Sequence, residues 1–186
     1  MTTQSVLFNR EPIWLENRQG LHHRLPLTVQ SWTYESGSLT QRLRRQFGPD
    51  VAVKVLFNAW RHPFLTERRL LKLPEQHYSV TREVLLHVKG RPLILARTII
   101  PRVTVKTAKS DLSKLGSRPL GEIIFSYPKL ERVAMDMSLV EVPTWKSSIV
   151  TEVGIQQPVW GRRTVYGIAN NTLLVSEFFL PEVLNY

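Results

Sequence analysis

The segment of residues 78–101, YSVTREVLLHVKGRPLILARTIIP, contains two apolar runs separated by a short turn. Residues 78–88 and 93–100 each have the pattern of a β-strand, and Lys89-Gly90 lies between them. Two strands that are joined by so short a turn pair in the antiparallel direction. The segment therefore predicts a β-hairpin within an antiparallel sheet.

Four further segments predict strands on either side of this hairpin. Residues 51–58 alternate with a period of two, and residues 130–142 form another candidate. Residues 164–169 and 172–180 flank Asn170-Asn171, a pair that suits the positive φ angles of a tight hairpin turn. Six strands that are mostly linked by hairpins, with short helices between them, predict one α+β domain with an antiparallel sheet of about six strands.

Two regions of the sequence predict short helices between the strands. Residues 38–48 form an amphipathic pattern that opens with a capping box at Ser38. Residues 110–115 predict a second helix, and Pro119 starts a third. We expect the regions 38–48 and 110–125 to cover one face of the sheet.

The composition excludes several classes of protein. The chain has 186 residues, 42% of them hydrophobic and 22% charged, which rules out disorder, collagen and coiled coil as overall descriptions. It contains no cysteine, so a disulfide scaffold, a thiolate zinc site and a Cys nucleophile are excluded. Residues 164–176 are the longest stretch without charge, too short for a membrane-spanning helix, and no signal peptide is visible. We expect a soluble cytoplasmic protein without stable membrane insertion, in which residues 1–30 form an arm packed on the domain.

The net charge of +10 fits a nucleic acid, a membrane surface or an anionic small molecule as the partner, and it fits equally well a solvated surface without any partner. The basic residues form neither a tail nor a continuous stripe, and no nucleic-acid-binding motif is present, so we expect no nucleic-acid partner. The sequence also lacks a G-x-G dinucleotide fingerprint, a phosphate loop and a G-x-S-x-G elbow. Its five histidines show no H-E-x-x-H spacing, so no metal site is expected.

Charged residues occupy apolar positions in three of the predicted strands. Arg82, Arg97 and Glu177 each share the face of their strand with aliphatic or aromatic residues. A charged group that points into an apolar layer loses several kcal/mol of hydration unless something compensates it. Either these residues pair with one another, or they line a cavity that holds a polar ligand; an error of one residue in the strand register would reverse the faces.

A cavity that contains Arg82 and Glu177 would suit a particular kind of ligand. A buried arginine is a fork-shaped donor for a carboxylate, and a buried glutamate accepts a hydrogen bond from a hydroxyl group. Together they match a small ring with a carboxylate at one end and a hydroxyl at the other.

Four ordered segments of the sequence resemble the bacterial chorismate pyruvate-lyase family. They are Arg82–Leu86 with Gly90–Pro92 and Ala96–Pro101, then Leu115-Gly116 with Arg118–Gly121, then Trp160–Arg163, and finally Ser176–Pro181. Their order and spacing match the family from about Trp32 to the C-terminus. The resemblance implies helical flaps over a buried ligand cavity, in a catalytic domain that spans residues 31–186.

The resemblance also implies an activity and its residues. The family is a carbon-oxygen lyase that converts chorismate to 4-hydroxybenzoate and pyruvate, the first committed step of ubiquinone biosynthesis, without metal or organic cofactor. Its ligand-contacting arginine and glutamate fall on Arg82 and Glu177, which are the expected catalytic residues. Two flap positions that contact the ligand through the backbone fall on Leu39, where some relatives carry Met, and on Leu120. Arg97 is either a second anion contact or a partner of Glu177.

Two functions other than that of an enzyme remain possible interpretations of the sequence. Ligand-sensing domains of some bacterial transcription regulators resemble the same fold and bind small effectors without chemistry. They are normally fused to a winged-helix domain, for which residues 1–30 are too few. The interpretation as a nucleic-acid-binding protein would rest on the net charge alone. For Arg162 and Arg163 a structural or surface role is favoured. We expect a monomer, because a sealed cavity in one domain needs no partner subunit.

Overall fold

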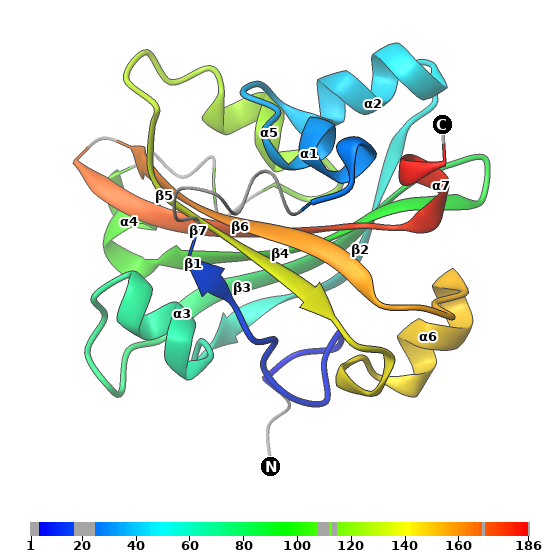
Figure 1. The fold of residues 1–186 in the computed structure, drawn as a ribbon. Helices are drawn as coiled ribbons and strands as arrows, with labels where there is room; N and C mark the ends of the chain where they lie inside the picture. The colour runs from blue at the N-terminus through cyan, green and yellow to red at the C-terminus, as the bar shows by residue number, and fades with distance from the viewer. Residues whose placement is uncertain (1–3, 17–24, 108–111, 113–114, 169, 186) are drawn as a thin grey trace.

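Seven strands form one antiparallel sheet in the order β1-β5-β6-β7-β4-β3-β2 (Figure 1). A computed structural model describes residues 4–16, 25–107, 112, 115–168 and 170–185. The strands are β1 (Leu15–Glu16), β2 (Ala52–Arg61), β3 (Ser79–Val88), β4 (Arg91–Pro101), β5 (Glu131–Val140), β6 (Val159–Ile168) and β7 (Asn171–Phe179). The helices are α1 (Leu27–Thr33), α2 (Leu39–Phe47), α3 (Leu65–Leu70), α4 (Arg102–Thr107), α5 (Leu120–Ile124), α6 (Ser147–Val153) and α7 (Pro181–Leu184), with a 3₁₀ turn at Val142–Thr144.

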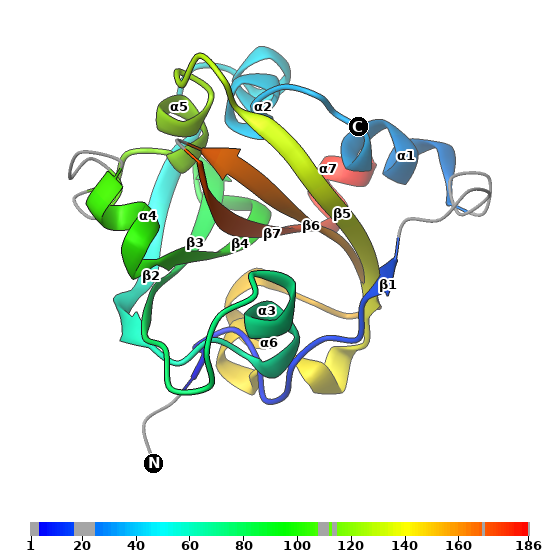
Figure 2. The same cartoon turned by 90° about the vertical axis from the view of Figure 1, so that its left-hand side faces the viewer.

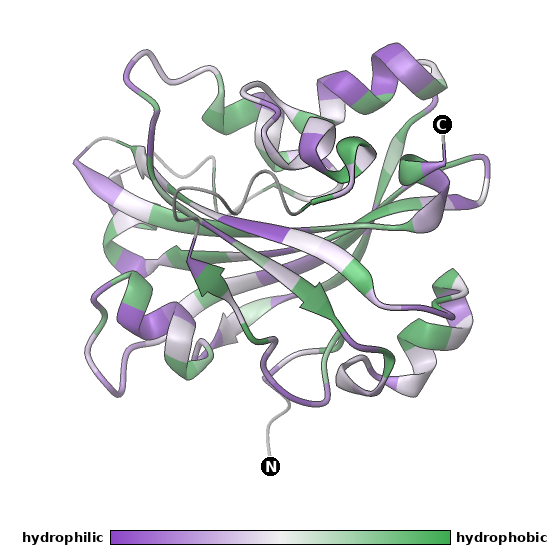
Figure 3. Cartoon of the chain, in the orientation of Figure 1, coloured by the Kyte–Doolittle hydropathy of each residue, from purple (hydrophilic) through white to green (hydrophobic). Residues whose placement is uncertain are grey.

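Helices cover both faces of this twisted sheet. Helices α1, α2 and α5 lie over one face, and α3 and α6 lie over the other (Figures 1 and 2). Along β3, Leu85 packs with the core of the α6 side, whereas its neighbour Leu86 packs with the core of the α2 side. Strands β3 and β4 are accordingly buried on both faces along most of their length. Figure 3 shows hydrophobic residues interspersed with hydrophilic ones along the sheet, and mostly hydrophilic residues on α2.

The hairpin predicted from residues 78–101 is formed by β3 and β4. Lys89 and Gly90 both have positive φ, +48° and +81°, as a two-residue hairpin turn requires. Val88 lies opposite Arg91, but Leu86 lies opposite Ile94, so β4 contains one extra residue. This β-bulge shifts the pairing by one position along the rest of the hairpin.

The fold class predicted from the sequence is confirmed. The six predicted strands are β2 to β7, and the additional strand, β1, has only two residues. Helix α2 has the predicted cap, because the Ser38 hydroxyl accepts a hydrogen bond from the Gln41 N–H at 3.4 Å. The helix predicted over residues 110–115 falls mostly outside the described residues. Strand β6 starts five residues earlier than position 164, at Val159.

The N-terminal residues pack across the α3–α6 face. Phe8 forms a β-bridge with Trp145, and the Ser5 hydroxyl donates to Glu83 at 2.5 Å. The proposed boundary between residues 30 and 31 falls inside α1, and the division into an arm and a catalytic domain stays a prediction. No helix in the described part of the chain is long and apolar enough to cross a membrane.

Gly161 allows a close contact between β6 and an aromatic core. A Cβ at this position would lie 2.5 Å from Cδ1 of Phe178, whose ring is buried against Trp145 at a centroid distance of 5.1 Å. We expect Gly161→Ala to lower the free energy of unfolding by about 1–3 kcal/mol, the usual cost of overpacking a core. The matched control is Gly167→Ala in the same strand, where the nearest atom would be Cγ2 of Val133 at 3.4 Å.

Urea unfolding of the two variants measures the difference. The control should stay within about 0.5 kcal/mol of the unsubstituted protein, as is usual where a substitution meets ordinary contacts. Equal losses in both variants would show that the contact with Phe178 is not what requires glycine.

Candidate active site

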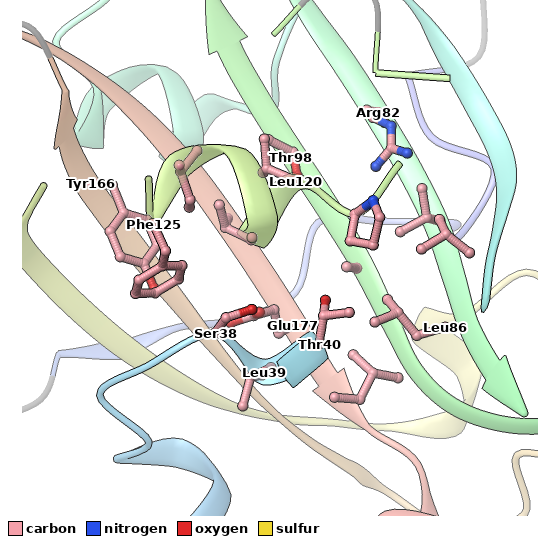
Figure 4. Close-up of a pocket in the computed structure, with 18 residues that line it drawn as sticks. Ser38, Leu39, Thr40, Arg82, Leu86, Thr98, Leu120, Phe125, Tyr166 and Glu177 are labelled. Carbon is pink, nitrogen blue, oxygen red and sulfur yellow. The ribbon is translucent and has the colours of Figure 1, made fainter. Parts of the chain in front are cut away.

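A cavity lies between the sheet and helices α2 and α5 (Figure 4). It contains about 570 Å³ of empty space, which includes open solvent at its mouth. Strands β2, β3, β4, β6 and β7 and the two helices contribute to its walls. The lining residues are Ser38, Leu39, Thr40, Val53, Arg82, Val84, Leu86, Ile94, Ala96, Thr98, Pro119, Leu120, Gly121, Ile124, Phe125, Tyr166, Val175 and Glu177.

Arg82 reaches the cavity from β3 and is 2% exposed. Its Nη2 donates to the carbonyl oxygens of Gly116 at 2.8 Å and Arg118 at 3.2 Å, both in the segment before α5. Its Nε has no hydrogen-bond partner, and no carboxylate of the described residues forms an ion pair with it. Burial lowers the pKa of Arg82 to about 10, so the guanidinium is cationic at neutral pH. The cavity therefore contains a buried cation that an anionic ligand would compensate.

Glu177 enters the same cavity from β7, with β4 between it and the strand of Arg82. Its Oε2 accepts a hydrogen bond from Nε of Arg162 at 2.8 Å. Two of the three charged residues singled out by strand alternation, Arg82 and Glu177, thus face one cavity (Figure 4). Glu177 is paired with Arg162 rather than with Arg82. Aliphatic side chains of β3 and β4 line the cavity beside them.

Two helical flaps close the cavity, and we use this term for α2 with its cap Ser38 and for α5. Leu39 and Leu120 are the first residues of these helices and line the cavity. The first N–H groups of a helix have no acceptor within the helix, so both positions offer backbone donors. The flaps touch each other, because a Cβ on Gly121 would lie 2.7 Å from Oγ of Ser38.

Tyr166 adds a polar group to the wall formed by β6. Its ring is 2% exposed and meets the edge of Phe125 at a centroid distance of 6.0 Å. Burial raises the pKa of Tyr166, and the charge of Glu177 raises it further. The Tyr166 hydroxyl is therefore protonated at neutral pH and can donate a hydrogen bond in the cavity.

Relatives of known family match nearly the whole chain. The family model described as Chorismate lyase matches residues 9–185. A protein of Methylococcus capsulatus named probable chorismate pyruvate-lyase is 43% identical over 157 residues, which cover 84% of this chain and 97% of the relative. A protein of the same name from Thiobacillus denitrificans is 34% identical over 161 residues, with 86% of each chain covered.

The chain belongs to the chorismate lyase family. Membership of this family makes it an enzyme of the lyase class, as the resemblance implied.

Solved structures of similar fold come from transcription regulators. The effector domain of PhnF from Mycobacterium smegmatis has a TM-score of 0.57 at 13% identity, covering 78% of this chain and 90% of that one. A GntR-family regulator from Bacillus cereus has a TM-score of 0.56 at 14% identity, covering 72% of this chain and 93% of that one. At such identities the likeness shows the fold alone.

Arg97, the third charged residue singled out by alternation, lies on the opposite face of the sheet. Its Nε and Nη2 donate to the carboxylate of Glu67 at 2.7 and 3.0 Å, and its Nη1 donates to Glu83 at 2.6 Å. Burial alone would lower the pKa of Arg97, but the two carboxylates raise it above its ordinary value. The expectation that Arg97 pairs with Glu177 is wrong, and Arg97 is not among the residues that line the cavity.

The bulge in β4 explains this error. If the register of Val88 opposite Arg91 continued, Arg97 would lie opposite Arg82, and directly opposed residues share a face. The extra residue in β4 brings Thr98 opposite Arg82 and Arg97 opposite Glu83 instead. Thr98 accordingly lines the cavity, and Arg97 does not.

The adjacent arginines of β6 point to different faces. Arg163 donates to Asp136 at 2.8 Å and to the Thr66 hydroxyl at 2.6 Å on the α3 side, which is a structural role. Arg162 contacts Glu177 and therefore belongs to the site. Alternation shows that the two differ in face but not which one faces the cavity, so Arg162 and Tyr166 were missed from the sequence.

The structure thus brings Leu39, Arg82, Leu120 and Glu177 together at one cavity. The described residues contain no group of three or more His, Asp or Glu side chains that could hold a metal ion.

Removal of the Arg97 side chain should destabilise the fold. Arg97→Ala leaves Glu67 and Glu83 buried without their cation, for which about 3–5 kcal/mol is typical. Arg91→Ala, in the same strand, removes a solvent-exposed pair with Glu182 and should cost at most about 1 kcal/mol. Chemical denaturation of both variants gives the comparison, and similar losses would contradict a buried ion network at Arg97.

Removal of the Arg82 side chain should instead stabilise the ligand-free protein. Arg82→Leu removes a buried, uncompensated cation, and replacing buried charge by an apolar side chain often stabilises by about 1–4 kcal/mol. We expect the free energy of unfolding of the variant to rise, while the affinity for an aromatic carboxylate falls. A loss of stability in the ligand-free variant would mean that the contacts to Gly116 and Arg118 outweigh the desolvation of the cation.

Proposed function

We propose that this protein is a chorismate pyruvate-lyase that converts chorismate to 4-hydroxybenzoate and pyruvate. The observation that carries the proposal is the arrangement of Arg82, buried without a carboxylate partner, and Glu177 in one cavity beneath two flaps. The relatives named for this activity support the same assignment.

Substrate binding would use the charge of Arg82 and the backbone of the flaps. Chorismate is a dianion, which a protein of net charge +10 attracts. We assign the ring carboxylate to the guanidinium of Arg82, with the N–H groups of Leu39 and Leu120 as further donors. We assign the ring hydroxyl to the carboxylate of Glu177.

The reaction breaks the ether bond between C3 of the ring and the enolpyruvyl oxygen. The C4 proton leaves, its electron pair completes the aromatic ring, and the released enolpyruvate takes up a proton to become pyruvate. All atoms of chorismate appear in the two products without oxidation or reduction, so the proposed step needs no redox cofactor. Glu177 is the one carboxylate among the lining residues, and we assign it to the C4 proton as well as to the hydroxyl.

Positioning and charge stabilisation would supply most of the rate enhancement. The elimination yields an aromatic ring, so the enzyme has to hold the reactive conformation and exclude water rather than supply a strong reagent. The flaps are in contact and cover the cavity, which is consistent with slow product release. We place this activity in the cytoplasm, in a monomer, at the first committed step of ubiquinone biosynthesis.

A sensor of small aromatic acids is the second candidate. The fold is shared with effector domains of regulators, and an anion site in a closed cavity would serve binding alone. Turnover separates the two functions, because a sensor would bind 4-hydroxybenzoate tightly and leave chorismate unchanged.

Direct assay with chorismate tests the proposal. We expect 4-hydroxybenzoate, followed by its absorbance, and pyruvate, followed with a coupled dehydrogenase, to appear in equal amounts. Arg82→Met should lower kcat/KM by about 10–100-fold, the value of a charge-assisted hydrogen bond. Glu177→Gln keeps an acceptor but removes the charge and should lower kcat by about 10²–10⁴-fold.

Glu182→Gln is the control, because this glutamate lies in α7 and pairs only with the exposed Arg91 among the described contacts. It should retain full activity. Wild-type activity in both site variants would refute the assignment of Arg82 and Glu177. Binding of 4-hydroxybenzoate without turnover by the unsubstituted protein would replace the lyase by the sensor.

A further inference from the structure

Arg162 lies directly opposite Glu177 in the pairing of β6 with β7. Its side chain is 1% exposed, and its Nε donates to Oε2 of Glu177 at 2.8 Å. Burial alone would lower the pKa of Arg162, but the Glu177 carboxylate raises it above its ordinary value. Arg162 is therefore the fixed cation beside the carboxylate of the cavity.

The same guanidinium holds the segment that leads into the α2 flap. Its Nη1 donates to the carbonyl oxygens of Thr33 at 2.8 Å, Glu35 at 3.0 Å and Trp32 at 3.4 Å. These residues end α1 and start the connection to Ser38, the cap of α2. The last carbonyl groups of a helix have no partner within the helix, so an arginine side chain satisfies them well.

The connection between α1 and α2 thus rests on β6 through charged side chains. Arg132, on the neighbouring strand β5, also donates to the carbonyl oxygen of Glu35. Four residues after Glu35, α2 begins with Leu39, which lines the cavity. A movement of this connection therefore changes the position of the flap, and it must also disturb the guanidinium that pairs with Glu177.

We propose that Arg162 is a positioning residue that couples the carboxylate of Glu177 to closure of the α2 flap. Ligand contact at Glu177 fixes the guanidinium, which strengthens its hold on residues 32–35 and so favours the closed flap. By reciprocity, a closed flap favours ligand contact at Glu177. For substrate turnover the inference rests on the proposed function, but the structural coupling does not.

Two substitutions separate the two contacts of Arg162. Arg162→Lys keeps a cation beside Glu177 but cannot reach the carboxylate and three carbonyl oxygens at once, because a lysine has one compact donor group. Arg162→Gln removes the charge as well. The control is Arg163→Lys, which changes an equally placed arginine on the opposite face of the same strand.

Hydrogen exchange of the backbone amides, followed by mass spectrometry, measures flap opening. In the ligand-free protein, both Arg162 variants should speed exchange in residues 33–41 by about tenfold, a typical coupling factor, whereas Arg163→Lys should not. Glu177→Gln weakens the hydrogen bond that the carboxylate accepts from Arg162 and should therefore speed exchange in the same residues. Unchanged exchange in Glu177→Gln would overturn the coupling, and this arm needs no substrate.

Kinetics gives a second readout that a purely structural role would not change. If chorismate is turned over, the activity lost in Arg162→Gln should return in part in Arg162→Lys, which keeps a cation beside the Glu177 carboxylate. Equal loss of activity in both variants would contradict the positioning role. If Arg162→Gln does not fold, the exchange of Arg162→Lys and Glu177→Gln decides the question.

Discussion

The cavity depends on one buried cation that has no carboxylate partner among the described residues. Arg82 extends from β3 into a largely apolar space, and its hydrogen bonds go to the carbonyl oxygens of Gly116 and Arg118. A guanidinium in such surroundings is unfavourable until an anion reaches it. Under the proposed function, the stability lost at Arg82 is converted into selectivity for an anionic ligand. The segment before α5 accepts hydrogen bonds from the guanidinium, which ties Arg82 to one of the two flaps.

On the opposite face of the sheet, the buried arginines are paired with carboxylates of the protein itself. Arg97 is held between Glu67 and Glu83, and Arg163 donates to Asp136. These groups are compensated within the protein, so they need no ligand and attach α3 to the sheet. Arg97 and Glu83 also lie opposite each other in the β3–β4 pairing. A buried ion pair at this point disfavours any other register, and the register determines that the neighbouring residue of β3, Arg82, faces the cavity.

Alternation within a strand was enough to single out Arg82 and Glu177 as charged residues among apolar ones, because the side-chain period of a strand is a local property. Whether they paired with each other or lined a cavity stayed open at that point. The face of Arg97 relative to Arg82 was not predictable in this way. The relative face of these two residues depends on the pairing between the two strands. The extra residue in β4 cannot be recognised from the alternation pattern of either strand. Residues 32–35 are more than a hundred positions away from Arg162 in the chain, so the local spacing of residues does not predict their contacts with it. Short helices such as α3 and α6 were also missed, since their stability comes from packing rather than from a periodic pattern.

The different pairing of Arg82 and Arg162 determines the direction in which a ligand can bind. Arg162 is already neutralised by Glu177 and occupied by backbone carbonyl groups, so it does not compete for a carboxylate. A ring with a carboxylate at one end and a hydroxyl at the other is stabilised with its carboxylate at Arg82. In the reverse orientation its carboxylate would meet the carboxylate of Glu177, and the cation of Arg82 would remain uncompensated. Discrimination by an unfavourable alternative is effective in a poorly hydrated cavity, where charges interact strongly. Under the proposed function, turnover needs this single orientation, because it brings the carbon that loses its proton next to Glu177.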